Sequence, residues 1–226
     1  MGGDRSRERG ALTVGHLVLL GDSILDNRTY TSPEPETAEC LRGMLGTGWT
    51  VELLARDGAV MSEIPYQLAR LRGDADVSIL SVGGNDALGH SGILEESAAA
   101  ARTVLSRLAD IAEDFGARYR GVLAEARPRS RRLVACTIYE PPMFDATTTR
   151  LIRVPLSLLN DQIVREATRA GVDVLDLRSV CTSAATSSGR SSRRPREPGG
   201  SRRPSRRSCA ECRREPRSRS SDGPVR

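Results

Sequence analysis

The chain has 226 residues, of which 38% are hydrophobic and 28% charged, a composition typical of one α/β domain with a substantial core. It has no apolar run of roughly 18 residues and no signal-peptide hydrophobic segment, so we expect a cytoplasmic protein without a membrane span. The net charge of +5 comes from residues 183–226, which carry thirteen Arg against four acidic residues, whereas the rest of the chain is net acidic. A folded nucleic-acid site is therefore not indicated.

The five cysteines are scattered and odd in number: Cys40, Cys136, Cys181, Cys209 and Cys212. Without an export signal, this pattern argues against a disulfide framework. Cys209 and Cys212 have the spacing of a zinc-binding pair, but no second pair and no nearby His completes four ligands. A glycine-rich phosphate-binding loop is also absent from the sequence, so we expect no metal and no other cofactor.

The first predicted element is a buried strand that ends at a tight turn. Four apolar residues, 17–20, run directly into Gly21, Asp22 and Ser23. Ligands bind beyond the carboxyl ends of parallel strands, and a Gly lets the backbone turn sharply enough to present a hydroxyl there. On its own, the tripeptide favours an ordinary turn in which Asp22 or Ser23 caps the next segment.

The following residues alternate between helical and strand patterns. Apolar spacing predicts helices over residues 38–44, 60–72, 94–126 (broken near Gly116) and 156–170, the last preceded by a loop over residues 140–154. Apolar runs rich in β-branched residues predict strands over residues 49–55, 76–82, 133–139 and 172–177. This order predicts a flavodoxin-like, three-layer α/β/α domain with a parallel sheet of about five strands.

The domain is predicted to span residues 16–182, between a flexible charged leader, residues 1–15, and a tail. Residues 183–226 contain no Leu, Ile, Met, Phe, Tyr or Trp, so we expect this tail to be disordered. All 34 basic residues of the chain are Arg, as GC-rich codons would give, and such DNA read out of frame yields the tail's Arg, Pro, Ser and Gly. One hypothesis is therefore a shift of reading frame near Ser183.

Three of the predicted strands end in residues suited to acyl transfer: Ser23 after the first, Gly58 after the second and Asn85 after the third. Acyl transfer needs a nucleophile and donors aimed at the oxyanion of the tetrahedral intermediate. A backbone N–H at Gly58 and the side-chain amide of Asn85 are such donors. Taken singly, each residue is more typical of a turn or a cap, but together they favour a catalytic site.

Residues 21–23 (Gly-Asp-Ser), Gly58 and residues 83–86 (Gly-Gly-Asn-Asp) resemble, in order and spacing, the first three blocks of the GDSL family, also called SGNH hydrolases. The resemblance covers roughly residues 16–182. It implies a serine esterase or lipase that acts on a small-molecule acyl ester or thioester. Ser23 would be the nucleophile, supported by Asp22. The N–H groups of Ser23 and Gly58 and the side chain of Asn85 would form the oxyanion hole.

The fourth block of that family, Asp-x-x-His, is missing after Leu177. The chain has two His in all. His16 begins the strand before the nucleophile, and we expect it to be structural. His90 follows Asn85 by five residues, which makes it a candidate base from an unusual position. Without a base, Ser23 stays protonated and loses most of its nucleophilic advantage, so the sequence leaves open whether this chain is active.

Two other interpretations stay open. One is a noncatalytic scaffold whose Arg-rich tail binds RNA or another polyanion, nonspecifically and with strong salt dependence. Deleting residues 183–226 would abolish such a function. The other is a relic of the fold in which loss of the closing helix leaves apolar sheet surface exposed. For an enzyme, the loop over residues 140–154 and the region around Tyr30 are candidates for shaping an acyl pocket.

Overall fold

The structure is a computed structural model that describes residues 15–95, 100–140 and 145–181. Its sheet has five strands in the order β2-β1-β3-β4-β5, and every neighbouring pair is parallel. The strands are β1 (Gly15–Gly21), β2 (Trp49–Leu53), β3 (Ala75–Ser81), β4 (Ser130–Cys136) and β5 (Asp173–Leu175). The predicted α/β fold with a five-stranded parallel sheet is confirmed.

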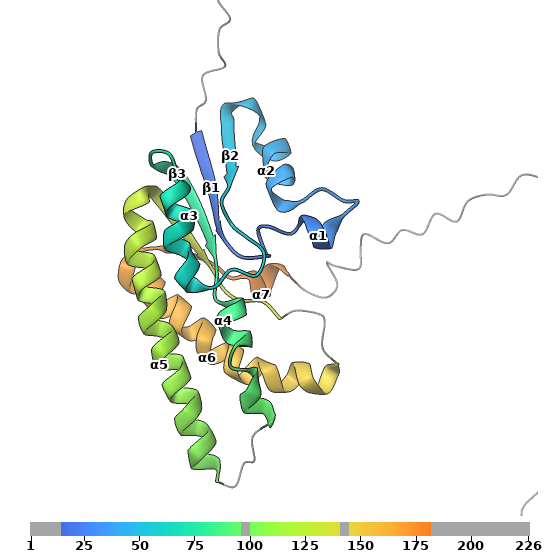
Figure 1. Cartoon of the computed structure of the whole chain (residues 1–226), viewed down its shortest axis with the longest axis vertical. Helices are drawn as coiled ribbons and strands as arrows, with labels where there is room; N and C mark the ends of the chain where they lie inside the picture. The colour runs from blue at the N-terminus through green and yellow to red at the C-terminus, as the bar shows by residue number, and fades with distance from the viewer. Residues whose placement is uncertain (1–14, 96–99, 141–144, 182–226) are drawn as a thin grey trace, which may run out of the picture. The chain divides into compact units, whose positions relative to one another are not determined.

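Helices connect the strands (Figure 1). They are α1 (Arg28–Thr31), α2 (Thr37–Leu45), α3 (Ile64–Arg70), α4 (Gly84–Leu88), α5 (Ala101–Ala126), α6 (Ala146–Ala170) and α7 (Leu177–Val180). Short 3-10 turns lie at Gly46–Gly48, Met61–Glu63, Ser91–Glu95 and Arg127–Arg129. Pro65 lies in the first turn of α3, where its missing N–H costs no helical hydrogen bond.

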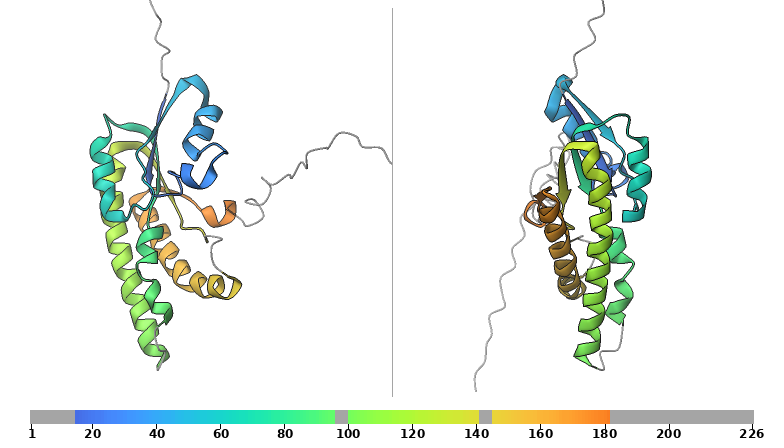
Figure 2. Two further views of the ribbon diagram at one scale, coloured as in Figure 1. Left: turned by 45° about the vertical axis from the view of Figure 1, so that its right-hand side comes forward. Right: turned by 90° about the vertical axis from the view of Figure 1, so that its left-hand side faces the viewer.

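Successive residues of β1 point to opposite faces of the sheet and divide the core in two. Val18 and Leu20 pack with buried residues of α3, α5 and α6, whereas Leu17 and Leu19 pack with Ala38 of α2. Figure 2 shows α3 and α5 on one side of the sheet and α2 on the other. Burying each Leu side chain contributes about 1.5–3 kcal/mol, so both clusters stabilise β1 at the centre of the fold.

Cover is thinner over the later strands on the α2 face. Ile79 of β3 pairs with Val134 of β4, and both are only partly buried. Cys136 pairs with Leu175 of β5, which is 39% exposed, and all three β5 residues are exposed. The apolar cluster on this face takes its helical residues from α2 and extends only as far as β3.

The long helices differ from the sequence-based expectation. The predicted break near Gly116 is wrong, because α5 runs unbroken from Ala101 to Ala126. A Cβ at Gly116 would lie 2.5 Å from Oε1 of Gln162 in α6, so this Gly permits close helix packing. The predicted start of this helix at residue 94 is also wrong, since residues 91–95 form a 3-10 turn.

Helix α6 begins at Ala146, ten residues before the predicted start, so most of the expected loop over residues 140–154 is helical. The Asp145 carboxylate accepts hydrogen bonds from the N–H groups of Thr147 and Thr148 and caps the helix. Pro155 lies inside the helix, directly before the predicted start at residue 156. The helix ends as predicted at Gly171.

The predicted leader and tail, apart from Gly15 at the start of β1, lie outside the described residues, as do Cys209 and Cys212. Within the described ranges, no helix combines the length and apolar character needed to cross a bilayer. Likewise, this part of the chain contains no group of three or more His, Cys, Asp or Glu side chains suitably placed to hold a metal ion.

Candidate active site

The turn after β1 requires a Gly at its first position. Gly21 has φ +129°, and a Cβ there would lie 1.8 Å from the carbonyl oxygen of Ser81 at the end of β3. The N–H of Asp22 donates to the same oxygen at 2.9 Å. The turn that carries Asp22 and the half-buried Ser23 is therefore fixed against the carboxyl end of β3.

Asp22 is buried in this turn. Its Oδ1 accepts the N–H of Ile24 at 3.2 Å, which is the local capping role that the tripeptide alone had suggested. Burial, with a smaller contribution from the nearby carboxylates of Asp86 and Asp57, outweighs the lowering effect of that hydrogen bond and raises the pKa of Asp22 to about 6. Asp22 therefore takes up a proton just below neutral pH.

The loop after β2 carries Gly58 and is tied to the turn after β1. The N–H of Arg56 donates to the carbonyl oxygen of Gly21 at 3.0 Å, and the N–H of Asp57 donates to Oδ2 of Asp26 at 2.9 Å. The Tyr30 hydroxyl hydrogen-bonds to both Asp57 oxygens, at 3.0 and 3.1 Å. Gly58 itself is exposed at the tip of this loop.

Asn85 lies in α4, directly after β3, and is tied to the Gly58 loop. Its Nδ2 donates to the carbonyl oxygen of Ala59 at 2.9 Å. A side-chain amide has two N–H donors, so the second can serve another acceptor. The neighbouring Asp86 is buried and accepts hydrogen bonds from the N–H of Met61, at 3.0 Å, and from the guanidinium of Arg118 in α5. Hydrogen bonds thus join the loops of Ser23, Gly58 and Asn85 to one another.

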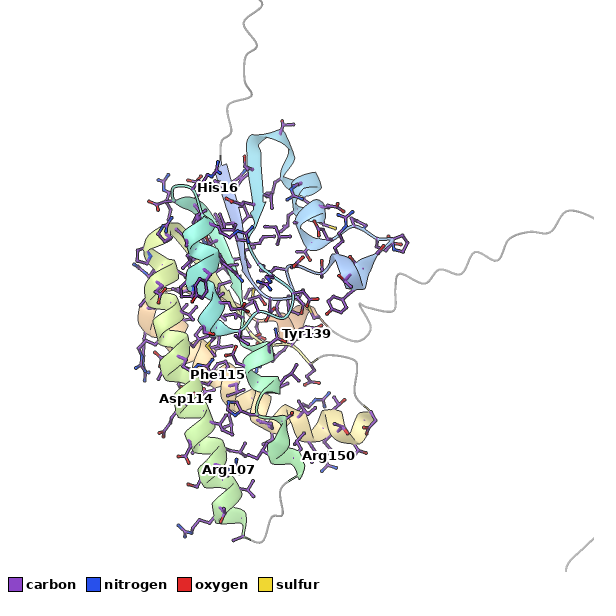
Figure 3. The ribbon with its side chains drawn as sticks, in the orientation of Figure 1. His16, Arg107, Asp114, Phe115, Tyr139 and Arg150 are labelled. Atoms are coloured by element: carbon purple, nitrogen blue, oxygen red, sulfur yellow. The ribbon has the colours of Figure 1, made fainter. Side chains whose placement is uncertain are left out.

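The two His residues lie in different parts of the fold. His16, at the start of β1, has its Nε2 3.0 Å from Oε2 of Glu52 on the neighbouring strand. Figure 3 places it at the opposite end of the sheet from Tyr139, which follows β4. His90 follows α4, is half-buried, and has its backbone in a turn in which its N–H donates to the carbonyl oxygen of Ala87. Within the described residues its imidazole makes no hydrogen bond.

Gln67, in α3, is a site residue that the sequence analysis missed. Its side chain is buried and makes two hydrogen bonds of 2.8 Å with Gly21, donating to the carbonyl oxygen and accepting from the N–H. Its spacing from the apolar residues of α3 could have identified it in the sequence. Gln67 lies three residues after Ile64 and four before Leu71, so this polar side chain is on the apolar face of its helix.

A similar amide lies at the end of β4. Asn160, in α6, accepts the N–H of Ile138 at 2.7 Å and donates to its carbonyl oxygen at 2.9 Å. Thr137, directly after β4, contacts the two residues that follow β5. Its hydroxyl donates to Oδ1 of Asp176 at 2.8 Å and accepts the N–H of Leu177 at 2.9 Å. Asp176 also pairs with Arg178, and this pair holds the pKa of Asp176 well below its usual range. These contacts connect the last strand to the sheet.

The sheet edge beneath the turn is apolar and poorly solvated. Burial raises the pKa of the Cys136 thiol to about 12 and also raises that of the Tyr119 phenol, and in each case the Asp22 charge adds to the shift. A negative charge formed close to the buried Cys136 and Tyr119 would depend on nearby N–H donors for its stabilisation.

A cavity of about 100 Å³ lies beside Gln67 and is lined by Leu54, Arg56, Glu63, Tyr66, Gln67 and Arg70.

Comparison with known proteins gives one family and one fold. The model of the GDSL-like Lipase/Acylhydrolase family matches residues 19–194. Phospholipase A1 from Streptomyces albidoflavus NA297 is 19% identical, with a TM-score of 0.54 over 74% of this chain and 80% of that one. The extracellular lipase from Streptomyces rimosus is 17% identical, with a TM-score of 0.53 over 73% and 81%.

A catalytic mutant of an acetylxylan esterase from Geobacillus stearothermophilus is 13% identical, with a TM-score of 0.52 over 76% of this chain and 80% of that one. Among curated proteins, no sequence matches this chain. At these identities the solved structures show a shared fold, and the family match rests on the sequence from Leu19 onward.

Proposed function

This chain belongs to the GDSL-like lipase/acylhydrolase family of hydrolases, and we propose that it cleaves carboxylic esters or thioesters of small acyl groups through Ser23. One observation carries the proposal: direct hydrogen bonds join the three loops that hold Ser23, Gly58 and Asn85. These are Arg56 N–H to Gly21 O at 3.0 Å and Asn85 Nδ2 to Ala59 O at 2.9 Å. A nucleophile and oxyanion donors need such fixed mutual placement.

In the proposed reaction, Ser23 Oγ attacks the acyl carbon and its proton passes to a base. The carbonyl oxygen becomes an oxyanion that accepts from the N–H of Ser23, the N–H of Gly58 and the free amide hydrogen of Asn85. The tetrahedral intermediate then collapses, the bond to the leaving alcohol or thiol breaks, and the base returns the proton to that leaving group. Water hydrolyses the acyl-enzyme by the same steps.

His90 is the proposed base. It follows α4, so it lies a short way past Asn85 beyond the same strand end. A neutral imidazole nitrogen can accept the Ser23 proton and later return it to the leaving group, which is the task of a general base. His16 is excluded from this role because it lies at the amino end of β1 with Glu52 as its partner.

The charge around the site favours a neutral acyl group. Asp57 and Asp86 are close enough to Asp22 for their charges to raise its pKa. An anionic acyl group would add a further negative charge to this cluster and would bind poorly. We therefore expect uncharged short acyl esters to be better substrates than esters of dicarboxylic acids.

Labelling with a fluorophosphonate probe tests the proposal without a guessed substrate. An activated Ser displaces fluoride from the phosphorus and becomes covalently phosphonylated. We expect wild type to label and Ser23→Ala not to label. Ser157→Ala is the matched control, because Ser157 is exposed on α6 and bonds its own helix, so its loss should leave the rate unchanged. His90→Ala should slow labelling by about 100-fold or more.

Each outcome is decisive for one part of the proposal. A folded wild type that does not label overturns the esterase proposal, and labelling that persists in Ser23→Ala overturns the nucleophile assignment. If wild type labels but His90→Ala labels equally fast, the base is another group. The folded state of each variant is checked by circular dichroism.

A further inference from the structure

The side-chain amide of Gln67 adds a further attachment at the end of β1, where Gly21 pairs with Ser81 of β3 and its carbonyl oxygen also accepts the N–H of Arg56 at 3.0 Å. β2 pairs with β1 only from Gly15 to Leu19, so Gly21 extends two residues beyond that pairing. There the Gln67 amide accepts the N–H of Gly21 and donates to its carbonyl oxygen, both at 2.8 Å, as a neighbouring peptide group would. The amide is buried, so water does not compete for these bonds.

Gly21 is the point at which the chain leaves the sheet. Its φ of +129° is open to Gly and to few other residues, and the absence of a side chain also makes it the most mobile kind of residue. Ser23 follows only two residues later. A change in the direction of the chain at Gly21 therefore moves the Ser23 hydroxyl directly, and a displacement of about 1 Å can cost a reaction 100-fold in rate.

We propose that Gln67 is a positioning residue for Ser23. By bonding both backbone groups of Gly21, it fixes the direction in which the turn leaves β1 and so holds the nucleophile in reach of its acyl carbon. This inference rests on the proposed function for its catalytic consequence. Its structural part, that Gln67 holds the turn rigid, is measurable in the absence of any activity.

Gln67→Met tests the inference by removing both hydrogen-bonding groups while keeping the length of the side chain. We expect the fluorophosphonate labelling rate to fall about 10-fold or more. Asn160→Met is the matched control, because Asn160 makes the same pair of bonds with Ile138 at the end of β4. It should lose stability similarly but label within about 3-fold of wild type.

Gln67→Glu gives a readout that a merely structural role would not produce. A neutral carboxyl group can donate its O–H to the Gly21 carbonyl oxygen and accept the N–H, whereas a carboxylate can only accept and would repel that oxygen. Burial will raise the pKa of this Glu. We expect the labelling rate of Gln67→Glu, divided by that of wild type, to be near one at low pH and to fall as pH rises through that pKa.

Amide hydrogen exchange of Gly21 and Asp22 tests the structural part directly. In folded Gln67→Met we expect both amides to exchange about 10-fold faster than in wild type, while the Ile138 amide is unchanged. Unchanged exchange overturns the inference. So does normal labelling by folded Gln67→Met, or a pH-independent rate ratio for Gln67→Glu. A wild type that does not label, but whose Gly21 amide is protected by Gln67, overturns the proposed function and leaves the positioning of the turn established.

Discussion

The two halves of the sheet are built differently on the face that α2 covers. Leu19 in β1 is fully buried beneath α2, whereas Leu175 in β5, on the same face, is 39% exposed. The first half carries the three family blocks and is linked by hydrogen bonds between its loops. The second half is where the resemblance places the fourth block. The contrast teaches that the hydrogen bonds joining the loops of Ser23, Gly58 and Asn85 are made by residues that follow β1, β2 and β3.

Adding a single methyl group at Gly21, in the first half of the sheet, should cause the largest loss of folding stability. Gly21→Ala places a Cβ 1.8 Å from Ser81 O, which the backbone cannot accept, so we expect a loss of more than about 4 kcal/mol or no folding. Gly171→Ala is the control in the second half. Gly171 also has positive φ, at +64°, but no described atom lies within 4 Å of its Cβ position, so about 1 kcal/mol should be lost. Urea denaturation measures both, and equal losses would show that the turn after β1 relaxes freely.

Two Leu to Ala substitutions on the same face sharpen the contrast. Leu19→Ala should lower the free energy of unfolding by about 2–5 kcal/mol, because it leaves a cavity in a closed core. Leu175→Ala should cost less than about 1 kcal/mol, because water already reaches that side chain. Urea denaturation of both variants tests this. A loss above about 2 kcal/mol for Leu175→Ala would mean that this face of β5 is covered in the intact protein.

The buried carboxyl of Asp22 gives a smaller, pH-dependent effect. Its pKa is about 6 in the folded protein and near its ordinary value of 3.8 in the unfolded chain. At a pH between these two pKa values, Asp22 is protonated in the native state and ionised in the unfolded chain. The contribution of Asp22 to stability therefore falls as pH rises from about 4 to 6. Asp22→Asn keeps an oxygen acceptor for Ile24 and removes the titration. We expect its stability relative to wild type to increase by on the order of 1–3 kcal/mol between pH 4 and pH 7. A difference independent of pH would contradict the buried, proton-binding state of Asp22.

Local pattern was sufficient to predict the parallel sheet and the three loops of the candidate site. The apolar run at residues 17–20 and the β-branched runs that follow have the period and length of buried strands, and each is followed by turn residues. The carboxyl ends of parallel strands share one edge, so Ser23, Gly58 and Asn85 could be assigned to it without coordinates. Each of these signals lies within a few residues of the chain.

The features that escaped prediction depend on contacts between distant residues. Gly116 looked like a helix breaker, but its role is set by Gln162, a residue in another helix. The helix predicted to start at residue 156 begins ten residues earlier and continues through Pro155. Gln67 bonds Gly21 from 46 positions away, and only its place on an apolar helix face hinted at a buried partner. A pattern read along the chain does not say which backbone group an amide will reach.

The two faces of the sheet have different optical signals, because the chain has a single Trp and its two longest described helices lie on the opposite face from it. A Cβ at Gly15 would lie 2.6 Å from Cζ3 of Trp49, so the indole ring covers the start of β1 and belongs to the α2 cluster. Tryptophan fluorescence therefore reports on that side of the sheet. The 26 residues of α5 and the 25 of α6 supply most of the helical circular dichroism and report on the other side. If the two signals change at one urea concentration, the two sides unfold as a single cooperative unit, and if they separate, the side with less cover has come apart first.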